Sequence, residues 1–348
     1  MSDPMDRGEQ QMATHEANFP VGRTVKNPAG SRVTVKRWRL PVETLVLGLT
    51  LLLWVVMSLS TSTFFTANNL VNILRQVSVD SIIAFGVLFP ILIRGIDLSV
   101  GSVTALSGVV CATLLTMGLP IPVAIGLTLL LGVAIGSLNA FSVHRLGIPA
   151  FIITLAGLQA YRGGAFLVSD GTSVFGLPKE MASFARAEWL GIPSLFWTML
   201  VIGLILHFIL SQTRTGRYMV AMGSNYESAR RAGINIKRIV FFAYIVSSLA
   251  ACIAGILLMS RMSIGSPTAA VAYELNAIAA AVVGGASLFG GRGSVLGTFI
   301  GALLFATIAN SANLLGIDSF WQMIATGVLI AVVVYVDNLH KRRQSGLK

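Results

Sequence analysis

The sequence predicts an all-α, polytopic membrane helix bundle of about ten transmembrane helices, with both termini in the cytoplasm. Three observations predict it. The 348 residues are 55% hydrophobic and only 11% charged, whereas soluble domains carry about 25% charged residues. Long apolar runs recur along the chain, and basic residues gather in alternate connecting segments. So little charge over such a length places most of the chain in lipid.

A spanning helix needs roughly 20 apolar residues. Runs of this kind are found at 42–62, 79–95, 100–117, 121–143, 150–168, 194–210, 239–260, 275–289, 294–313 and 319–336. The first, sixth, seventh and tenth are clear. Glycine and charge interrupt the apolar pattern near 95–100 and 290–294, so the boundaries there are weakly defined. The segment 68–77 has apolar residues at the spacing of one helical face, which fits an interfacial helix or an extension of the second span equally well.

Basic residues give the orientation, because Lys and Arg are retained on the cytoplasmic side. With ten spans and a cytoplasmic N-terminus, the inner segments hold 20 Lys and Arg residues, and the outer segments hold four. The formal net charge of +11 is therefore a sign of membrane topology and no indication of nucleic-acid binding. We expect three parts: a disordered cytoplasmic tail at 1–41, a membrane domain at 42–336, and a basic cytoplasmic tail at 337–348.

The loop 211–238 is the longest polar interruption of the membrane domain. Ser224 and Glu227 have the S-x-x-E spacing of a capping box, in which each side chain satisfies a backbone N–H at a helix start. Gly233 can adopt the left-handed conformation that ends a helix. We therefore expect one helix of about eight residues. Because isolated helices this short are marginal in water, it needs a docking surface, although a solvated loop remains an alternative.

Glycines are concentrated near the start of the ninth predicted span. Gly293, Gly297 and Gly301 recur every four residues, and small residues at that spacing let membrane helices approach closely. The group predicted to pack helices consists of Gly284, Gly285, Gly290, Gly291, Gly293, Gly297 and Gly301. The phosphate-binding pattern GxxxxGK[ST] is missing from the sequence, so we expect the chain to bind no nucleotide itself.

Several polar residues lie in or near the predicted spans. Such groups are costly in lipid and tend to face a bundle interior or a polar path. The candidates for a translocation path are Asp97, Ser99, Asn139, Thr154, Gln159, Glu274 and Asn276. Each could instead bond two helices together, which is the commoner role. Arg94 and Asp97 are three apart and could pair. The sequence places Asp and Glu away from the middle of a span, which suits a neutral polyol better than an ion-driven carrier.

Two sets of motifs resemble the inner-membrane permeases of ribose-type (ribose, xylose, arabinose) sugar ABC importers. One set is Phe64-Phe65-Thr66 with Asn69-Leu70, Asn72 to Gln76, and the string Gly-Ile-Asp-Leu-Ser-Val-Gly-Ser at 95–102. The other is Gly223-Ser224-Asn225 through Gly233-Ile234, with Glu274 through the glycine-rich segment to Val295. The resemblance covers roughly residues 42–336.

The resemblance implies a transport subunit of the bacterial inner membrane that performs no chemistry. It implies a second permease subunit in a homodimer or heterodimer, two cytoplasmic ATPase subunits that bind ATP and Mg, and a periplasmic sugar-binding protein. The loop helix would then be the coupling helix that fits the ATPase. Its expected residues are Ser224, Asn225, Glu227, Ala229, Arg230, Arg231, Gly233 and Ile234.

Two other functions compete with this interpretation. An ion-coupled secondary transporter of a small polar solute would work without an ATPase. An intramembrane enzyme would need a cluster such as HExxH or a paired-Asp arrangement, but the four histidines, His15, His144, His207 and His340, are scattered. We therefore expect no catalytic residue, no metal site and no cofactor bound by this chain.

Overall fold

The computed structural model describes residues 24–26, 32–34, 42–318, 320–325, 327–328, 331 and 335. The chain divides into two units, residues 1–41 and 42–348. In the first unit, strand β1 (Thr24–Lys26) pairs antiparallel with β2 (Arg32–Thr34), with Thr24 opposite Thr34. The predicted disordered tail otherwise falls on residues outside those described, as does the basic tail at 337–348.

The second unit is a bundle of helices, as predicted. Seven helices are long and apolar enough to cross a membrane in the described part of the chain. These are α1 (Val42–Ser60), α2 (Ala67–Leu92), α4 (Ile121–His144), α5 (Ala150–Val168), α7 (Ser194–Gln212), α10 (Ile236–Met262) and α12 (Val295–Leu314). Two apolar helices are shorter, α3 (Val100–Thr116) and α11 (Tyr273–Val283).

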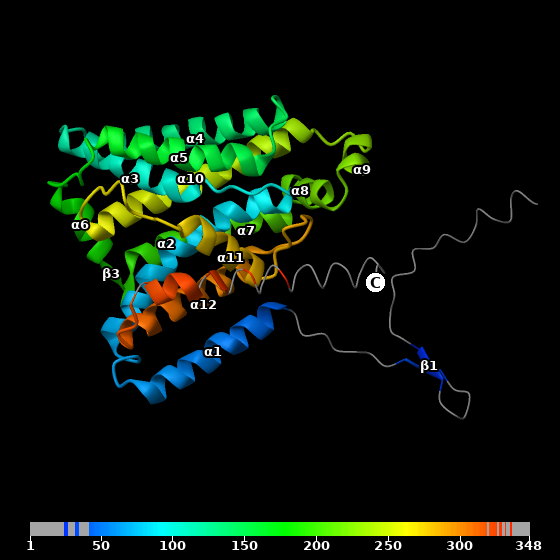
Figure 1. Cartoon of the computed structure of the whole chain (residues 1–348), viewed down its shortest axis with the longest axis horizontal. Coiled ribbons are helices and arrows are strands. Elements are labelled where there is room, and N and C mark those ends of the chain that lie inside the picture. The colour runs from blue at the N-terminus through cyan, green and yellow to red at the C-terminus, as the bar shows by residue number, and fades with distance from the viewer. Residues whose placement is uncertain are drawn as a thin grey trace, which may run out of the picture. The chain divides into compact units, whose positions relative to one another are not determined.

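Short elements occupy the two ends of the bundle (Figure 1). Helix α6 (Lys179–Arg186) and the paired strands β3 (Glu188–Trp189) and β4 (Ile192–Pro193) lie at one end. Helices α8 (Arg214–Ser224) and α9 (Tyr226–Arg231) lie at the other. The loop 211–238 and the segment 169–193 are thus separated by the length of the spanning helices.

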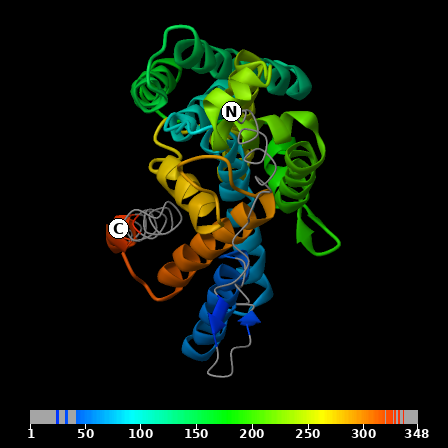
Figure 2. The ribbon, with the colours of Figure 1, turned by 90° about the vertical axis from the view of Figure 1, so that its right-hand side faces the viewer.

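Helices α2 and α10 form the centre of the bundle. Helix α10 packs against α2, α3 and α4, and α2 also packs against α7, α11 and α12. In α2 almost every side chain from Val77 to Leu92 is buried, as expected of a helix that is apolar on all sides. Helix α1 packs mainly on α12, at the edge opposite α4 and α5 (Figure 2). Its exposed leucines, such as Leu59, which is 85% exposed, suit a lipid environment.

Three predicted boundaries need correction or are settled by the structure. Helix α2 begins at Ala67, so the segment 68–77 extends the second span and is no separate interfacial helix. The predicted span at 275–289 is too long, because α11 has 11 residues, about 16 Å at 1.5 Å per residue. That is half of a hydrocarbon core of about 30 Å. The tenth predicted span, 319–336, is helical at the residues described there.

Candidate functional site

The loop that the sequence singled out contains two helices, where one was predicted. Helix α8 has 11 residues and buries Met219 and Met222, and α9 follows directly with six. The predicted capping box is wrong. Asn225 caps α9, because its Oδ1 accepts a hydrogen bond from the Ser228 N–H at 2.9 Å. Ser224 ends α8 instead, and its hydroxyl donates to the Val220 carbonyl at 2.8 Å.

Helix α9 ends as the sequence indicated. Gly233 is left-handed, with φ of +78°. The Gly233 N–H donates to the Arg230 carbonyl, and the Ile234 N–H donates to the Ala229 carbonyl, which is the Schellman pattern of a helix end. Ala229 is buried and Ile234 is partly buried, whereas Glu227, Arg230 and Arg231 are exposed. Helix α9 thus packs against the rest of the protein through Ala229, and its charged side chains are exposed.

Arg94 joins this loop to the end of α2. Its Nε donates to the Gly223 carbonyl and its Nη2 to the Ser224 carbonyl, both at 2.7 Å. The suggested pairing of Arg94 with Asp97 is therefore wrong. The physical reason is that the last carbonyls of α8 have no partner within the helix, and they attract a cation.

A cluster of hydrogen-bonded polar side chains lies inside the bundle, between α3, α4, α5 and α10. Asp97 accepts from the Ser99 hydroxyl at 2.6 Å and from the Ser247 hydroxyl at 2.8 Å. Asn139 donates to the Ser99 hydroxyl at 3.2 Å and accepts from the Tyr161 hydroxyl at 2.9 Å. Asp97 is fully buried. We call this set of five residues the Asp97 cluster.

The position of Asp97 weakens one sequence argument. Asp80 lies near the middle of α2, so the prediction that no Asp or Glu lies in the middle of a span is wrong. Asp97 precedes α3 and lies within no helix. However, it bonds Ser247, which is near the middle of α10. Asp97 therefore contacts the middle of a candidate spanning helix, and acidic residues inside spans often belong to ion pathways or proton relays. Its hydrogen bonds come from hydroxyls and a backbone N–H.

The structure brings together some of the other predicted path residues and separates the rest. Thr154 donates to the Ile96 carbonyl at 2.9 Å, next to the cluster. Glu274 lies where α3 and α11 begin, because a Cβ added to Gly101 would fall 2.0 Å from its Oε2. That Oε2 has no hydrogen-bond partner in the described part of the chain. Gln159 is exposed on α5, and Asn276 is partly buried on α11.

Three polar residues of this region were not among the candidates for the path, although Arg162 was recognised as a charge inside a span. Ser247 and Tyr161 complete the Asp97 cluster, and nothing in the local sequence distinguishes them from other span residues. Arg162 in α5 donates to the carbonyls of Pro267 at 2.8 Å and Ala269 at 2.6 Å. It thereby holds the irregular segment between α10 and α11 against α5. The position of Arg162 inside a predicted span could have identified it, because a charged side chain in a span needs polar partners.

The predicted glycine group divides into two sets. Gly284, Gly297 and Gly301 lie where α11 touches α12, and a Cβ added to Gly297 would fall 2.0 Å from the Gly284 carbonyl oxygen. The other four, Gly285, Gly290, Gly291 and Gly293, lie in the loop between these helices. Gly290 and Gly291 adopt positive φ and contact the ends of α2 and α8.

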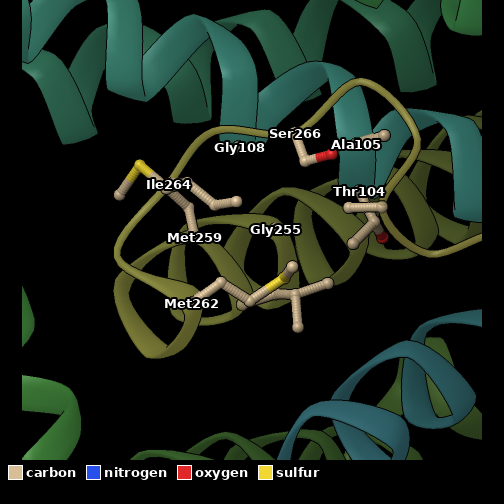
Figure 3. A pocket seen from close by; sticks show the side chains of 10 residues that line it. Thr104, Ala105, Gly108, Gly255, Met259, Met262, Ile264 and Ser266 are labelled. Atoms are coloured by element: carbon tan, nitrogen blue, oxygen red, sulfur yellow. The ribbon is translucent and has the colours of Figure 1, made fainter. Parts of the chain in front are cut away.

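Two cavities lie near these elements. One, of about 10 Å³, is lined by residues of α3, α10 and the following segment, among them Thr104, Gly108, Gly255 and Ser266 (Figure 3). It has room for about one water molecule. A second, of about 320 Å³, lies between α4, α6 and α10 and is lined mainly by apolar side chains. In the described residues, His, Cys, Asp and Glu form no group of three that could hold a metal ion.

Comparison with known proteins gives a family. Residues 69–333 match the family described as the permease component of the branched-chain amino acid transport system. The ribose import permease protein RbsC of Haemophilus influenzae is 42% identical over 292 residues, covering 83% of this chain and 90% of that protein. RbsC of Escherichia coli K12 is 40% identical over 319 residues, covering 90% and 99%.

A more distant relative is the xylose transport system permease protein XylH of Escherichia coli K12. It is 34% identical, covering 80% of this chain and 87% of that protein. No solved structure matches the chain. The chain therefore belongs to this family of transport permeases, and the resemblance to the ribose-type sugar permeases of ABC importers is confirmed.

Proposed function

We propose that this chain is the transmembrane permease subunit of an ABC importer that moves a ribose-like monosaccharide from the periplasm to the cytoplasm. A separate ATPase drives alternating access. The observation that carries the proposal is the 40% identity to the ribose import permease RbsC of Escherichia coli over 99% of that protein. Proteins that match end to end at this identity share their membrane architecture. The names of RbsC, XylH and the D-allose transport system permease protein AlsC of Escherichia coli K12 refer to sugars.

The proposed topology is ten crossings of the bacterial inner membrane with both termini in the cytoplasm. Two of these crossings are broken helices. After α2 ends, residues 93–99 return into the bundle before α3 begins. Likewise, an irregular segment follows α10 before α11 begins. The loop after α11 then reaches the end of α2, where the Gly291 N–H donates to the Leu92 carbonyl at 2.9 Å. Each break plus its short helix completes one crossing.

This arrangement supports a substrate path beside the two breaks. Interrupted helices of transporters start near the middle of the bilayer, and their N-termini offer free N–H groups to the substrate. Helices α3 and α11 both begin next to Gly101 and Glu274. We infer that Asp97, Ser99, Asn139, Thr154 and Glu274 border the path. Gln159 on α5 and Asn276 on α11 remain predicted path residues.

Coupling to the motor is assigned to α9. Its exposed residues, Glu227, Arg230 and Arg231, would contact a groove on the ATPase, and two ATPases would serve a dimer of permeases. ATP and Mg would be bound by those subunits, and a periplasmic sugar-binding protein would deliver the substrate. This chain then performs no hydrolysis. Its role is to convert ATPase movement into opening and closing of the path.

The competing function is an ion-coupled secondary transporter, which the buried Asp97 favours. Proteoliposomes separate the two. The permease is reconstituted with its cognate ATPase and binding protein, and labelled ribose, xylose and allose are offered with internal or external ATP and Mg. We expect uptake that needs ATP and all partners and that survives protonophores and sodium removal. Accumulation by the permease alone, driven by an imposed proton or sodium gradient, would overturn the proposal.

A further inference from the structure

We propose that Arg94 is a positioning residue that links the coupling helix α9 to the buried segment 95–99. The inference rests on the proposed function, since it assumes that α9 receives force from an ATPase. Three features carry it: the contacts of Arg94 with α8, the backbone junction around those contacts, and the bonds that the next residues make inside the bundle.

The first feature is the way in which Arg94 holds the end of α8. Its two nitrogens bond the carbonyls of Gly223 and Ser224 at 2.7 Å each. These are the last residues of α8, and Asn225, the N-cap of α9, follows at once. The planar fork of an arginine can bond two acceptors in a fixed orientation, which a lysine cannot. A movement of α9 must therefore stretch these bonds or carry Arg94 with it.

The second feature is a junction at which the backbones of Leu92, Gly223 and Gly291 touch directly. The Gly291 N–H donates to the Leu92 carbonyl at 2.9 Å. A Cβ added to Gly223 would fall 1.8 Å from the Leu92 oxygen and 2.5 Å from the Gly291 nitrogen. One added to Gly290 would fall 2.6 Å from Cγ of Arg94. Direct backbone contact thus joins the end of α2, the end of α8 and the loop before α12. None of these three segments can move toward another without a clash.

Arg94 itself adopts a strained backbone conformation. Its φ is +66°, in the left-handed region that costs a non-glycine residue free energy. Here the left-handed turn does two things at once. It ends α2 and starts the return of the chain toward Asp97.

The third feature is the set of bonds made by the segment 95–99. The Ile96 carbonyl accepts from Thr154 of α5. Asp97 accepts from Ser247 of α10, and Ser99 accepts from Asn139 of α4. A shift at Arg94 is therefore passed, within a few residues, to helices α4, α5 and α10 and to the start of α3. These are the elements that border the proposed path.

Arg94→Gln tests the link, with Arg292→Gln as the matched control. Arg292 is an exposed arginine of the adjoining loop, and its replacement makes the same change of charge. Each permease is reconstituted with the ATPase and binding protein. Labelled sugar uptake and ATP hydrolysis are measured in the same vesicles, and ATPase retention is measured by co-purification.

We expect Arg94→Gln to retain the ATPase, because the exposed face of α9 is unchanged. ATP hydrolysis should stay within about twofold of the unmodified complex, whereas sugar moved per ATP should fall about tenfold or more, equivalent to about 1.4 kcal/mol of lost coupling. The amount of sugar moved per ATP by Arg94→Lys should lie between that of the unmodified complex and that of Arg94→Gln, because a lysine ammonium keeps the charge but cannot bond both carbonyls in a fixed orientation. Arg292→Gln should transport normally. If Arg94→Gln fails to reach the membrane, Arg94→Lys decides in the same assay.

A combination variant tests whether the junction acts as a unit. Gly291→Ala should also lower the amount of sugar moved per ATP. In the double variant Arg94→Gln with Gly291→Ala, the fold-loss in this ratio should be smaller than the product of the two single fold-losses, because the two residues contact one junction and are coupled. An unchanged ratio of sugar to ATP in Arg94→Gln and Arg94→Lys would overturn the role of Arg94 while leaving the importer intact. Failure of the unmodified complex to use ATP would instead overturn the proposed function.

Discussion

The contact between α11 and α12 offers a quantitative test of the packing. At Gly301 of α12, an added Cβ would fall 2.0 Å from the carbonyl oxygen of Ala280, 2.9 Å from its carbonyl carbon and 3.1 Å from the nitrogen of Gly284. All three are backbone atoms, so no side chain can rotate away. Real Cβ atoms essentially never come closer than 3.0 Å to another heavy atom, so the helices must separate by about 1 Å.

Gly301→Ala should therefore destabilise the protein. Overpacking a well-packed contact costs about 1–3 kcal/mol, and alanine recovers about 0.5–1 kcal/mol because glycine is the poorer helix former. Because the obstacle is rigid backbone, we expect a net loss of about 2 kcal/mol. An unfolding entropy of about 2.1 cal/mol/K per residue over 348 residues corresponds to about 1.4 °C per kcal/mol, so the apparent Tm should fall by about 3 °C.

The matched control is Gly126→Ala in α4. Gly126 is exposed, and an added Cβ has nothing within 4 Å, so only the helix-propensity gain applies. Both proteins are heated in the same detergent, and the folded fraction is measured by size-exclusion chromatography. Gly126→Ala should unfold at or slightly above the temperature of the unmodified protein. An apparent Tm for Gly301→Ala equal to or above that of Gly126→Ala would refute the close contact.

Three further predictions concern the loop and the opposite end of α12. Asn225→Ala removes the N-cap of α9, at a cost of about 1 kcal/mol, and should lower ATP-dependent uptake. Its control, Ser224→Ala, should leave uptake nearly unchanged. Equal uptake by the two variants would contradict the assignment of Asn225 as the cap. Gly233→Val forces a β-branched residue into a left-handed conformation, at a cost of roughly 1–2 kcal/mol. It should weaken ATPase co-purification while membrane insertion, measured by immunoblot, stays intact. Asn69→Leu leaves the amide of Asn310 without its reciprocal partner, so the apparent Tm should fall, as expected from about 1–3 kcal/mol for a buried unpaired group. Replacing both asparagines with leucine should recover much of that loss, and no recovery would contradict the pairing.

Hydropathy predicted the long helices well because each of them has an apolar run long enough to cross a membrane. The runs at 42–62, 194–210 and 239–260 correspond to α1, α7 and α10. The same method failed at α11, where a short helix and the loop after it were merged into one span. Hydropathy averages over a window of span length. An apolar helix of 11 residues followed by the uncharged, glycine-containing residues 284–289 therefore looks like one crossing.

The capping error has a different origin. Ser224 satisfies the S-x-x-E pattern, but Asn225 is an equally good N-cap, so the local sequence allows two starts that differ by one residue. The choice is made by α8, which was not expected and which continues through Ser224. Because Arg94 binds the last carbonyls of α8 from a position 129 and 130 residues away in the sequence, no local pattern could contain this information.

The Asp97 cluster marks the limit of what sequence can supply. Asp97, Ser99 and Asn139 were proposed as path residues because polar groups near spans need partners, and that reasoning located three of the five members. Ser247 is 150 residues from Asp97 in the sequence, and serine is common in this chain's helices. Only packing of α3 against α10 reveals it as the donor to the second carboxylate oxygen.

The distribution of Asp97's hydrogen bonds bears on how the proposed sugar path would open. A buried carboxylate costs much free energy unless donors surround it, and here the donors belong to different elements: Ser99 at the start of α3 and Ser247 in α10. Separating these elements during transport would strip the carboxylate of one partner. A sugar hydroxyl arriving in the gap could replace the serine hydroxyl with the same chemistry. Substrate entry and helix separation would then stabilise each other, so the closed bundle would resist opening when no sugar is present.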